Sequence, residues 1–298
     1  MKNIVTGGTG FIGTRLIGRL ENPVVLGRDL DRIRQRFKDV EARQWHPEGP
    51  IDPSLFSDVD TIFHLAGESI ANGRWSRAKK ARIMRSRVET TKALVQALSR
   101  LDQRPGTLIC SSAIGYYGSR GSEILNESSP PGHDFLASVC QAWEEQAMRA
   151  EELGIRVVTV RTGIVLGPGG GVLSRMILPF KLGFGGRLGH GRQYMSWIHI
   201  DDLIGIMLHA AANDKVRGSI NGVSPNPVTN RQFTAALAAA LHRLALFPVP
   251  GLMLRLVLGE LATVALSSQR VIPDKAAKTG YRFLHPSVEE ALAASLQA

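Results

Sequence analysis

A glycine-rich turn after the first β-rich run constrains the fold more than any other feature of this sequence. The run VTGGTGFIG holds two overlapping motifs, GxGxxG at Gly8, Gly10 and Gly13 and GxxGxxG at Gly7, Gly10 and Gly13. A strand is predicted just before the turn and a helix just after it. In that setting the glycines allow a tight turn, and the helix N-terminus offers N–H groups to a pyrophosphate. The turn predicts dinucleotide binding, and the alternative is a turn that serves structure alone.

Short β-rich runs alternate with helical patterns over the first 165 residues. Such alternation predicts an α/β fold of the Rossmann type, a doubly wound parallel sheet with helices on both faces. The predicted strands are Asn3–Thr6, Val24–Leu26, a weak one at Ala42–Trp45, Thr61–Leu65, Thr107–Ser111 and Arg156–Thr162. The predicted helices begin at Phe11, cover Trp75–Leu98, and surround Cys140.

The second half of the chain has a different composition. Residues 163–191 are rich in glycine and are predicted to form a mobile, functional loop, whereas the C-terminal residues are helix-rich. We therefore expect a dinucleotide-binding Rossmann domain at residues 1–165, to which residues 192–225 return. Residues 166–191 and 226–298 are expected to form a smaller, helix-rich substrate-side region and a C-terminal extension.

The end of the second predicted strand indicates which dinucleotide binds. A cofactor without a 2′-phosphate is usually held there by an acidic residue, but this sequence reads VVLGRDL, with Gly27 and Arg28 at that point. Arginine suits a phosphate, so NADP is the expected cofactor. Asp29 follows directly and leaves NAD as the alternative.

The charge and the cysteine count limit the other partners. The net charge is +10, and basic residues gather in or beside one predicted helix. This region is either a solvated face or a patch that holds an anionic ligand. Nucleic acid is not expected, because aromatic residues are not interleaved among the basic ones. The basic residues are Arg74, Arg77, Lys79, Lys80, Arg82, Arg85, Arg87 and Lys92. Two isolated cysteines predict neither a disulfide framework nor a metal site. Because no apolar run is long enough to span a bilayer and no leader pattern is visible, we expect a cytoplasmic monomer or homodimer without membrane contact.

Several longer motifs resemble those of the extended short-chain dehydrogenase/reductase superfamily, the NAD(P)-dependent epimerases and dehydratases. These are TGGTGFIG, HLAG, SSAIGYYG and WIHIDDL. A closer resemblance is to an atypical branch called epimerase family proteins or SulA-like proteins, which carry a C-terminal extension. The motifs similar to this branch are AGESIANGRW, SRVETT, RTGIVLGPGGG, NGVSPNPVTN and SQRVIPDK.

The resemblance implies specific residue roles. The superfamily uses a serine, a YxxxK pair and an asparagine, and Ser112 matches the serine. Leu136 and Cys140 stand at the tyrosine and lysine positions, and Arg87 stands at the asparagine position. Leucine has no proton to give, so another acid must replace the tyrosine or no reaction occurs.

Tyr116 is the candidate replacement acid, although a packing role is the alternative for it and for its neighbour Tyr117. Cys140 lies on the apolar stripe of its helix, with Glu144 off that stripe. We expect its thiol to be neutral and mainly packed, a contact with cofactor or substrate being the alternative. For the WIHIDD segment, a structural role is preferred to catalysis.

The candidate site is thus defined by residue. The candidate catalytic residues are Ser112, Tyr116 and Cys140. Cofactor contacts are expected from Gly7, Gly10, Phe11, Ile12, Gly13, Gly27, Arg28, Leu65, Ala66, Gly67, Arg87 and Val165. Two functions remain open. One is an NADP-dependent epimerase or oxidoreductase acting on a small polar substrate such as a nucleotide sugar, and the other is a catalytically inactive NADP(H)-binding sensor or scaffold.

Overall fold

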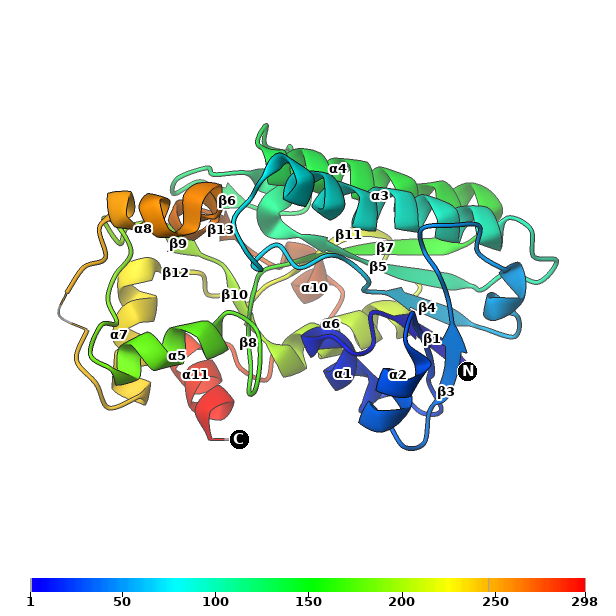
Figure 1. Cartoon of the computed structure of the whole chain (residues 1–298), viewed down its shortest axis with the longest axis horizontal. Coiled ribbons are helices and arrows are strands. Elements are labelled where there is room, and N and C mark those ends of the chain that lie inside the picture. Colours follow the sequence, from blue (N-terminus) through cyan, green and yellow to red (C-terminus); the bar gives the residue numbers. More distant parts are fainter. Residues whose placement is uncertain (1, 246, 298) are drawn as a thin grey trace.

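A parallel sheet forms the centre of the protein (Figure 1). The computed structural model describes residues 2–245 and 247–297, and in this part of the chain the sheet has seven strands. Their order is β11 (Gly218–Gly222), β7 (Arg156–Thr162), β5 (Thr107–Ala113), β4 (Thr61–His64), β1 (Asn3–Thr6), β2 (Val24–Gly27) and β3 (Glu41–Gln44). Every pair of neighbours is parallel.

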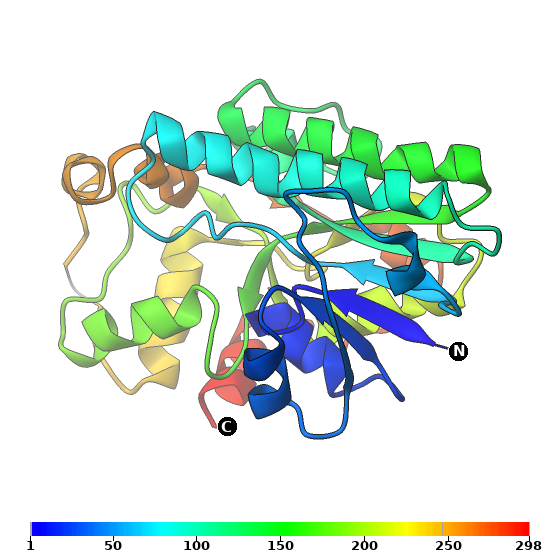
Figure 2. The ribbon, with the colours of Figure 1, turned by 45° about the vertical axis from the view of Figure 1, so that its right-hand side comes forward.

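Helices cover both faces of this sheet (Figures 1 and 2). One face carries α3 (Arg77–Leu98) and α4 (Phe135–Met148), and the other carries α1 (Phe11–Ile17), α2 (Leu30–Arg36) and α6 (Ile200–Ala212). The central strands are buried on both faces, so every residue of β4 and all of β7 except Thr162 are buried without alternation. The predicted Rossmann-type architecture is confirmed.

A smaller lobe lies beyond the carboxyl ends of the strands, at the left of Figure 1. Within the described residues, it contains three two-stranded sheets and several helices. The strand pairs are β8 (Ile164–Leu166) with β10 (Trp197–His199), β9 (Tyr194–Met195) with β12 (Val228–Thr229), and β6 (Ile124–Leu125) with β13 (Arg270–Val271). The helices are α5 (Leu173–Lys181), α7 (Asn230–Ala240), α8 (Gly251–Leu258), α9 (Ala262–Leu266) and α11 (Val288–Leu296).

The expectation of a loop throughout residues 163–191 was wrong. This segment contains β8 and α5, and the α5 side chains Leu173 and Phe180 are buried in the core of the lobe. The glycines lie between these elements and not within them. The division of the chain into two domains stays a prediction.

The C-terminal extension is tied to α6 by one buried carboxylate. Asp202 accepts backbone N–H groups of Leu284 at 2.7 Å and His285 at 2.9 Å, and the Tyr281 hydroxyl at 3.1 Å. The same extension supplies α10 (Asp274–Lys278), whose Ala276 joins the core under the sheet. The extension is therefore part of the folded body.

Candidate functional site

The glycine turn brings β1 against the end of β4. Gly7 has a φ of +70°, and a Cβ placed on it would lie 2.8 Å from the carbonyl carbon of Leu65 and 2.9 Å from the nitrogen of Ala66. A Cβ on Gly13 would lie 2.4 Å from the Gly7 oxygen. Only glycine fits at these two positions. The turn therefore lies against Leu65 and Ala66 at the end of β4 and leads directly into the N-terminus of α1, where free N–H groups can accept an anion.

Arg28 and Asp29 lie at the end of β2 but differ in their surroundings. The side chain of Arg28 is exposed, whereas one carboxylate oxygen of Asp29 accepts the Arg32 N–H at 2.9 Å and caps α2. A Cβ on Gly27 would lie 2.7 Å from the Ile33 Cδ1, so glycine lets Ile33 pack against this end of the strand. Both side chains are exposed, and the difference between them is that one oxygen of Asp29 is already bound to the backbone of α2.

The basic residues of the α3 region do not form one solvated face. Arg77, Arg82 and Arg85 are exposed, whereas Lys79 is buried and its Nζ donates to Glu68 at 2.5 Å. This contact lowers the pKa of the Glu68 carboxyl. The sequence reading did not single out Glu68, and no local pattern marks it as the partner of a buried lysine.

Arg87 also points inward. Its guanidinium donates to the carbonyl oxygen of Glu68 at 3.0 Å and lies over the Trp143 ring at 5.1 Å. A Cβ on Gly67 would lie 3.3 Å from the central carbon of this guanidinium. Arg87 therefore lies directly against the backbone at the end of β4, where the cofactor contacts are expected.

Leu136 and Cys140 of α4 line the candidate site on the side of the segment that follows β5. A Cβ on Gly115 would lie 3.2 Å from the Leu136 Cβ and 3.8 Å from the Cys140 Sγ. Cys140 is 3% exposed, and burial raises the pKa of its thiol to about 11, with Glu144 adding to the shift. The thiol is neutral at physiological pH and faces the loop that follows β5.

Ser112 belongs to a buried polar network. Its hydroxyl donates to Glu144 at 2.6 Å, and Arg161 forms two hydrogen bonds to the same carboxylate at 2.9 and 2.8 Å. Arg161 also donates to the Tyr117 hydroxyl at 3.0 Å. Burial raises the pKa of Tyr117 to about 12. Ser112 is thus held by protein groups and is itself buried.

The sequence predicted Glu144 off the apolar stripe of its helix, but in the structure Glu144 is buried. It is 8% exposed because Arg161, itself buried, compensates its charge. The signal for this pair was an arginine inside the otherwise buried strand RVVTVRT, which requires an acidic partner.

Tyr116 lies beside this network. The Arg161 guanidinium lies 3.4 Å from the centre of the Tyr116 ring, and the ring packs edge-on against Tyr117. Tyr116 is also packed against the apolar cluster that contains Ile114 and Val223. Its assignment as the replacement acid stays a prediction.

The glycine-rich run after β8 covers the start of α1. Cβ atoms placed on Gly167, Gly170 and Gly171 would lie 3.1, 2.3 and 3.0 Å from the Phe11 ring. Val165 lies in β8 just before this run. The structure therefore brings Phe11, Ile12 and Val165 to one region, next to the glycine turn.

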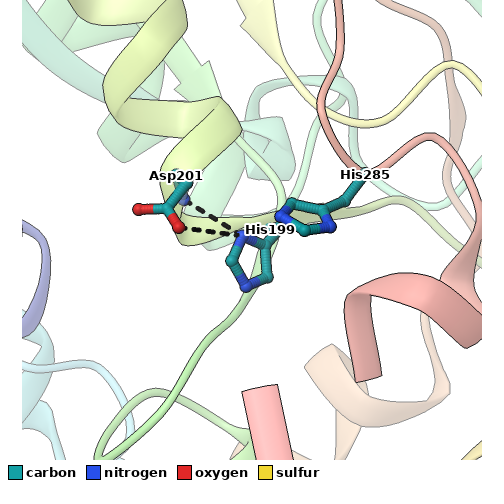
Figure 3. A group of neighbouring side chains, drawn as sticks. All are labelled: His199, Asp201 and His285. Atoms are coloured by element: carbon teal, nitrogen blue, oxygen red, sulfur yellow. Dashed lines mark hydrogen bonds and ion pairs between the residues drawn. The ribbon is translucent and has the colours of Figure 1, made fainter. Parts of the chain in front are cut away.

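Three further polar residues gather at the start of α6, as Figure 3 shows. One ligating atom from each of His199, Asp201 and His285 falls within 4.8 Å of the others. Arg15 occupies both Asp201 oxygens at 2.7 and 3.0 Å, and the His199 Nδ1 accepts the Asp201 N–H at 3.3 Å. Burial and the neighbouring His285 lower the pKa of His199. These contacts give the WIHIDD segment a structural role, which joins α1 to α6.

Two family matches cover most of the chain. Residues 3–221 match the NAD dependent epimerase/dehydratase family, and residues 249–295 match a domain of unknown function, DUF1731. The chain belongs to the NAD-dependent epimerase/dehydratase family, and the resemblance predicted from its motifs is confirmed.

Individual relatives agree with this assignment. The chain is 38% identical to the epimerase family protein SDR39U1 homolog, chloroplastic, of Arabidopsis thaliana, covering 98% of this chain and 86% of that protein. It is 36% identical to the epimerase family protein YfhF of Bacillus subtilis, covering 98% and 97%.

Two solved structures are similar in both sequence and fold. Human epimerase family protein SDR39U1 (isoform 2), crystallised with NADPH, has a TM-score of 0.89 and 34% identity, covering 100% of this chain and 99% of that one. A nucleoside-diphosphate sugar epimerase from Corynebacterium glutamicum has a TM-score of 0.75 and 31% identity, covering 99% and 58%. In the described part of this chain, no helix is long and apolar enough to cross a membrane.

Proposed function

We propose that this protein binds NADPH across the carboxyl ends of β1, β2 and β4. The pyrophosphate lies on the glycine turn at Gly7 to Gly13, and the adenosine 2′-phosphate lies against Arg28. The observation that carries the choice of NADPH over NADH is the exposed Arg28 beside an Asp29 that caps α2. The NADPH in the human SDR39U1 structure supports the same choice.

Arg87 completes the proposed cofactor site at the nicotinamide half. Its guanidinium is fixed by backbone carbonyl oxygens and by the Trp143 ring, beside Gly67. A donor held in this way needs little further ordering when it binds a ribose or phosphate oxygen. It stands where the superfamily has an asparagine.

Binding without turnover is the function that the site geometry favours. A leucine replaces the tyrosine, the Cys140 thiol has a pKa of about 11, and the Ser112 hydroxyl already donates to Glu144. The groups that would move a proton at the nicotinamide are therefore missing or already bound to protein. We propose an NADP(H)-dependent sensor or scaffold.

The second candidate is an epimerase or oxidoreductase acting on a small polar substrate such as a nucleotide sugar. It is favoured by the family itself and by the sugar epimerase from C. glutamicum. Tyr116, close to the Arg161 guanidinium, would be the acid in that case.

Fluorescence titration with NADPH and NADH tests the cofactor assignment. We expect NADPH to bind more tightly, and Arg28→Ala to weaken NADPH binding by about ten- to a hundredfold, the value of a charge-assisted hydrogen bond. NADH binding should change by less than about twofold, because NADH lacks the 2′-phosphate. Equal losses for the two cofactors would contradict the assignment of Arg28.

Single-turnover measurements separate the two functions. Protein loaded with NADP⁺ or NADPH is mixed with a panel of nucleotide sugars, and the absorbance of the reduced nicotinamide is followed. The sugars are also analysed for conversion by chromatography, because an epimerase returns the hydride to the product and leaves no net change in absorbance. The sensor or scaffold function predicts neither an absorbance change nor conversion of the sugar. An absorbance change that reaches the protein concentration, or conversion of a sugar, that is lost in Tyr116→Phe would establish the enzymatic function instead.

A further inference from the structure

The outer end of the smaller lobe exposes an unusual number of large apolar side chains. We call this surface the apolar tip. Its members are Leu178, Leu182, Phe184, Leu244, Phe247, Leu252, Met253, Leu256 and Val257, each between 55% and 75% exposed. Large exposed apolar patches on a folded protein mark a surface that contacts another phase or molecule.

The segments of the apolar tip are held together. The loop after α5 and the loop before α8 run side by side, because Gly189 donates to the Val249 oxygen at 2.9 Å and Val249 donates to the Arg187 oxygen at 2.8 Å. A hollow of about 620 Å³ lies between them, lined by Gly183, Ala239, His242, Arg243, Leu244 and Phe247. Figures 1 and 2 both place α8 and these loops at one end of the molecule, away from the N-terminus.

Helix α8 has the composition of a helix that lies on an interface. Its exposed residues Leu252 and Leu256 are one turn apart, with Met253 and Val257 beside them, and none of the eight residues Gly251–Leu258 is buried. A helix that packed against its own protein would bury such a face.

The charge of this end is mainly positive. The sequence contains no Asp or Glu at residues 153–200 and none at residues 215–259, and Glu260, which follows α8, forms an ion pair with Lys80. The tip segments carry Arg175, Lys181, Arg187, Arg192, Arg231, Arg243 and Arg255. Among these, Lys181, Arg243 and Arg255 are exposed beside the apolar residues.

We propose that the apolar tip binds the surface of an anionic lipid bilayer. Apolar side chains would enter the boundary between headgroups and acyl chains while the basic groups contact lipid phosphates. A second copy of this chain fits less well, because a twofold contact would bring the same basic groups together, and the nearby acidic residue Glu260 already pairs with Lys80. The proposal revises the sequence-based expectation of no membrane contact, which considered spanning segments only.

Vesicle sedimentation tests the proposal with the full chain. Vesicles of phosphatidylcholine alone are compared with vesicles of phosphatidylcholine and phosphatidylglycerol. We expect binding to the anionic vesicles only, weakened when the salt concentration rises from about 0.1 M to about 1 M. Wild-type protein that stays in the supernatant with both kinds of vesicle overturns the proposal.

Matched variants assign the contact. Leu252→Gln with Leu256→Gln should weaken vesicle binding by at least about tenfold. The control, Ile124→Gln with Leu284→Gln, changes two equally exposed apolar residues outside the tip and should bind as the wild type does. Both variants should keep the wild-type affinity for NADPH, which reports folding. If the α8 variant does not fold, Phe184→Gln with Phe247→Gln replaces it.

Two results would contradict the assignment. The first is binding by the tip variant that equals the binding of the wild type. The second is a wild-type protein that does not bind vesicles but forms a dimer, detected by light scattering, and a tip variant that is monomeric. The tip would then be an interface between two copies.

Discussion

At the scale of single residues, Arg87 distinguishes two roles for the basic residues of α3, contact with a ligand and exposure to solvent. Its guanidinium lies at Gly67 under the expected cofactor, whereas Arg85 on the same helix is exposed. We predict that Arg87→Gln weakens NADPH binding by about tenfold or more, because a charge-assisted hydrogen bond is lost. Arg85→Gln should leave the affinity within about twofold, since an exposed charge contributes little.

Fluorescence titration measures both affinities. Arg85 is the control because its side chain is exposed. Lys79, another basic residue of α3, is unsuitable because it is buried and pairs with Glu68. Equal affinities for Arg87→Gln and Arg85→Gln would remove Arg87 from the cofactor site.

Cys140 gives a prediction about pH. Burial raises the pKa of the thiol to about 11, so the thiolate is about one part in a thousand at pH 8. We predict that alkylation by iodoacetamide is slow at pH 7 and accelerates steadily as the pH rises towards 11. Mass spectrometry follows the reaction. A rate that levels off near pH 7 and falls when NADPH binds would instead indicate an activated nucleophile.

At the scale of elements, the packing of the glycine run on α1 can be tested at Gly170. A Cβ there would lie 2.3 Å from the Phe11 ring. We predict that Gly170→Ala lowers the free energy of unfolding by about 1–3 kcal/mol, the usual cost of overpacking, and also weakens NADPH binding. Urea denaturation measures the first effect. Gly49→Ala, with no neighbour within 4 Å of the added Cβ, should change stability by less than about 0.5 kcal/mol.

The same scale shows what the sequence could predict. Strands such as Asn3–Thr6 and Arg156–Thr162 were predicted with the bounds that the structure has, because a short run rich in β-branched residues is a local signal. Helix α5 was missed because the glycines around it dominate the composition of its segment. A short helix between such runs is stabilised by tertiary packing of Leu173 and Phe180, which the local pattern does not contain.

Parts of the site were hidden for a related reason. The glycine turn and Arg28 were visible because their positions follow directly from neighbouring strands. The burial of Glu144 depends on Arg161, and that of Lys79 depends on Glu68, and each partner comes from another element. Contacts between elements of this kind require the fold.

At the scale of the whole molecule, Asp202 attaches the C-terminal extension to the Rossmann body. It is fully buried and accepts two backbone N–H groups of that extension. We predict that Asp202→Ala destabilises the protein by about 2–4 kcal/mol, because buried donors lose their acceptor. The exposed Asp102→Ala should have almost no effect.

Hydrogen exchange locates the damage. Loss of protection in Asp202→Ala should be largest in residues 270–297. Uniform loss across the sheet, with the extension no worse than β1, would show that the carboxylate does not act as the attachment point.

The central claim, NADPH binding without the usual proton-transfer groups, is tested most directly by the distances in a crystal structure with bound NADPH. We predict the Arg28 guanidinium at about 3 Å from the 2′-phosphate. We also predict Leu136 and Cys140 beside the nicotinamide ring, with no ionisable side chain within about 3.5 Å of a substrate atom placed at its C4. A 2′-phosphate directed into solvent, or the Tyr116 hydroxyl at that distance from the substrate position, would contradict the account.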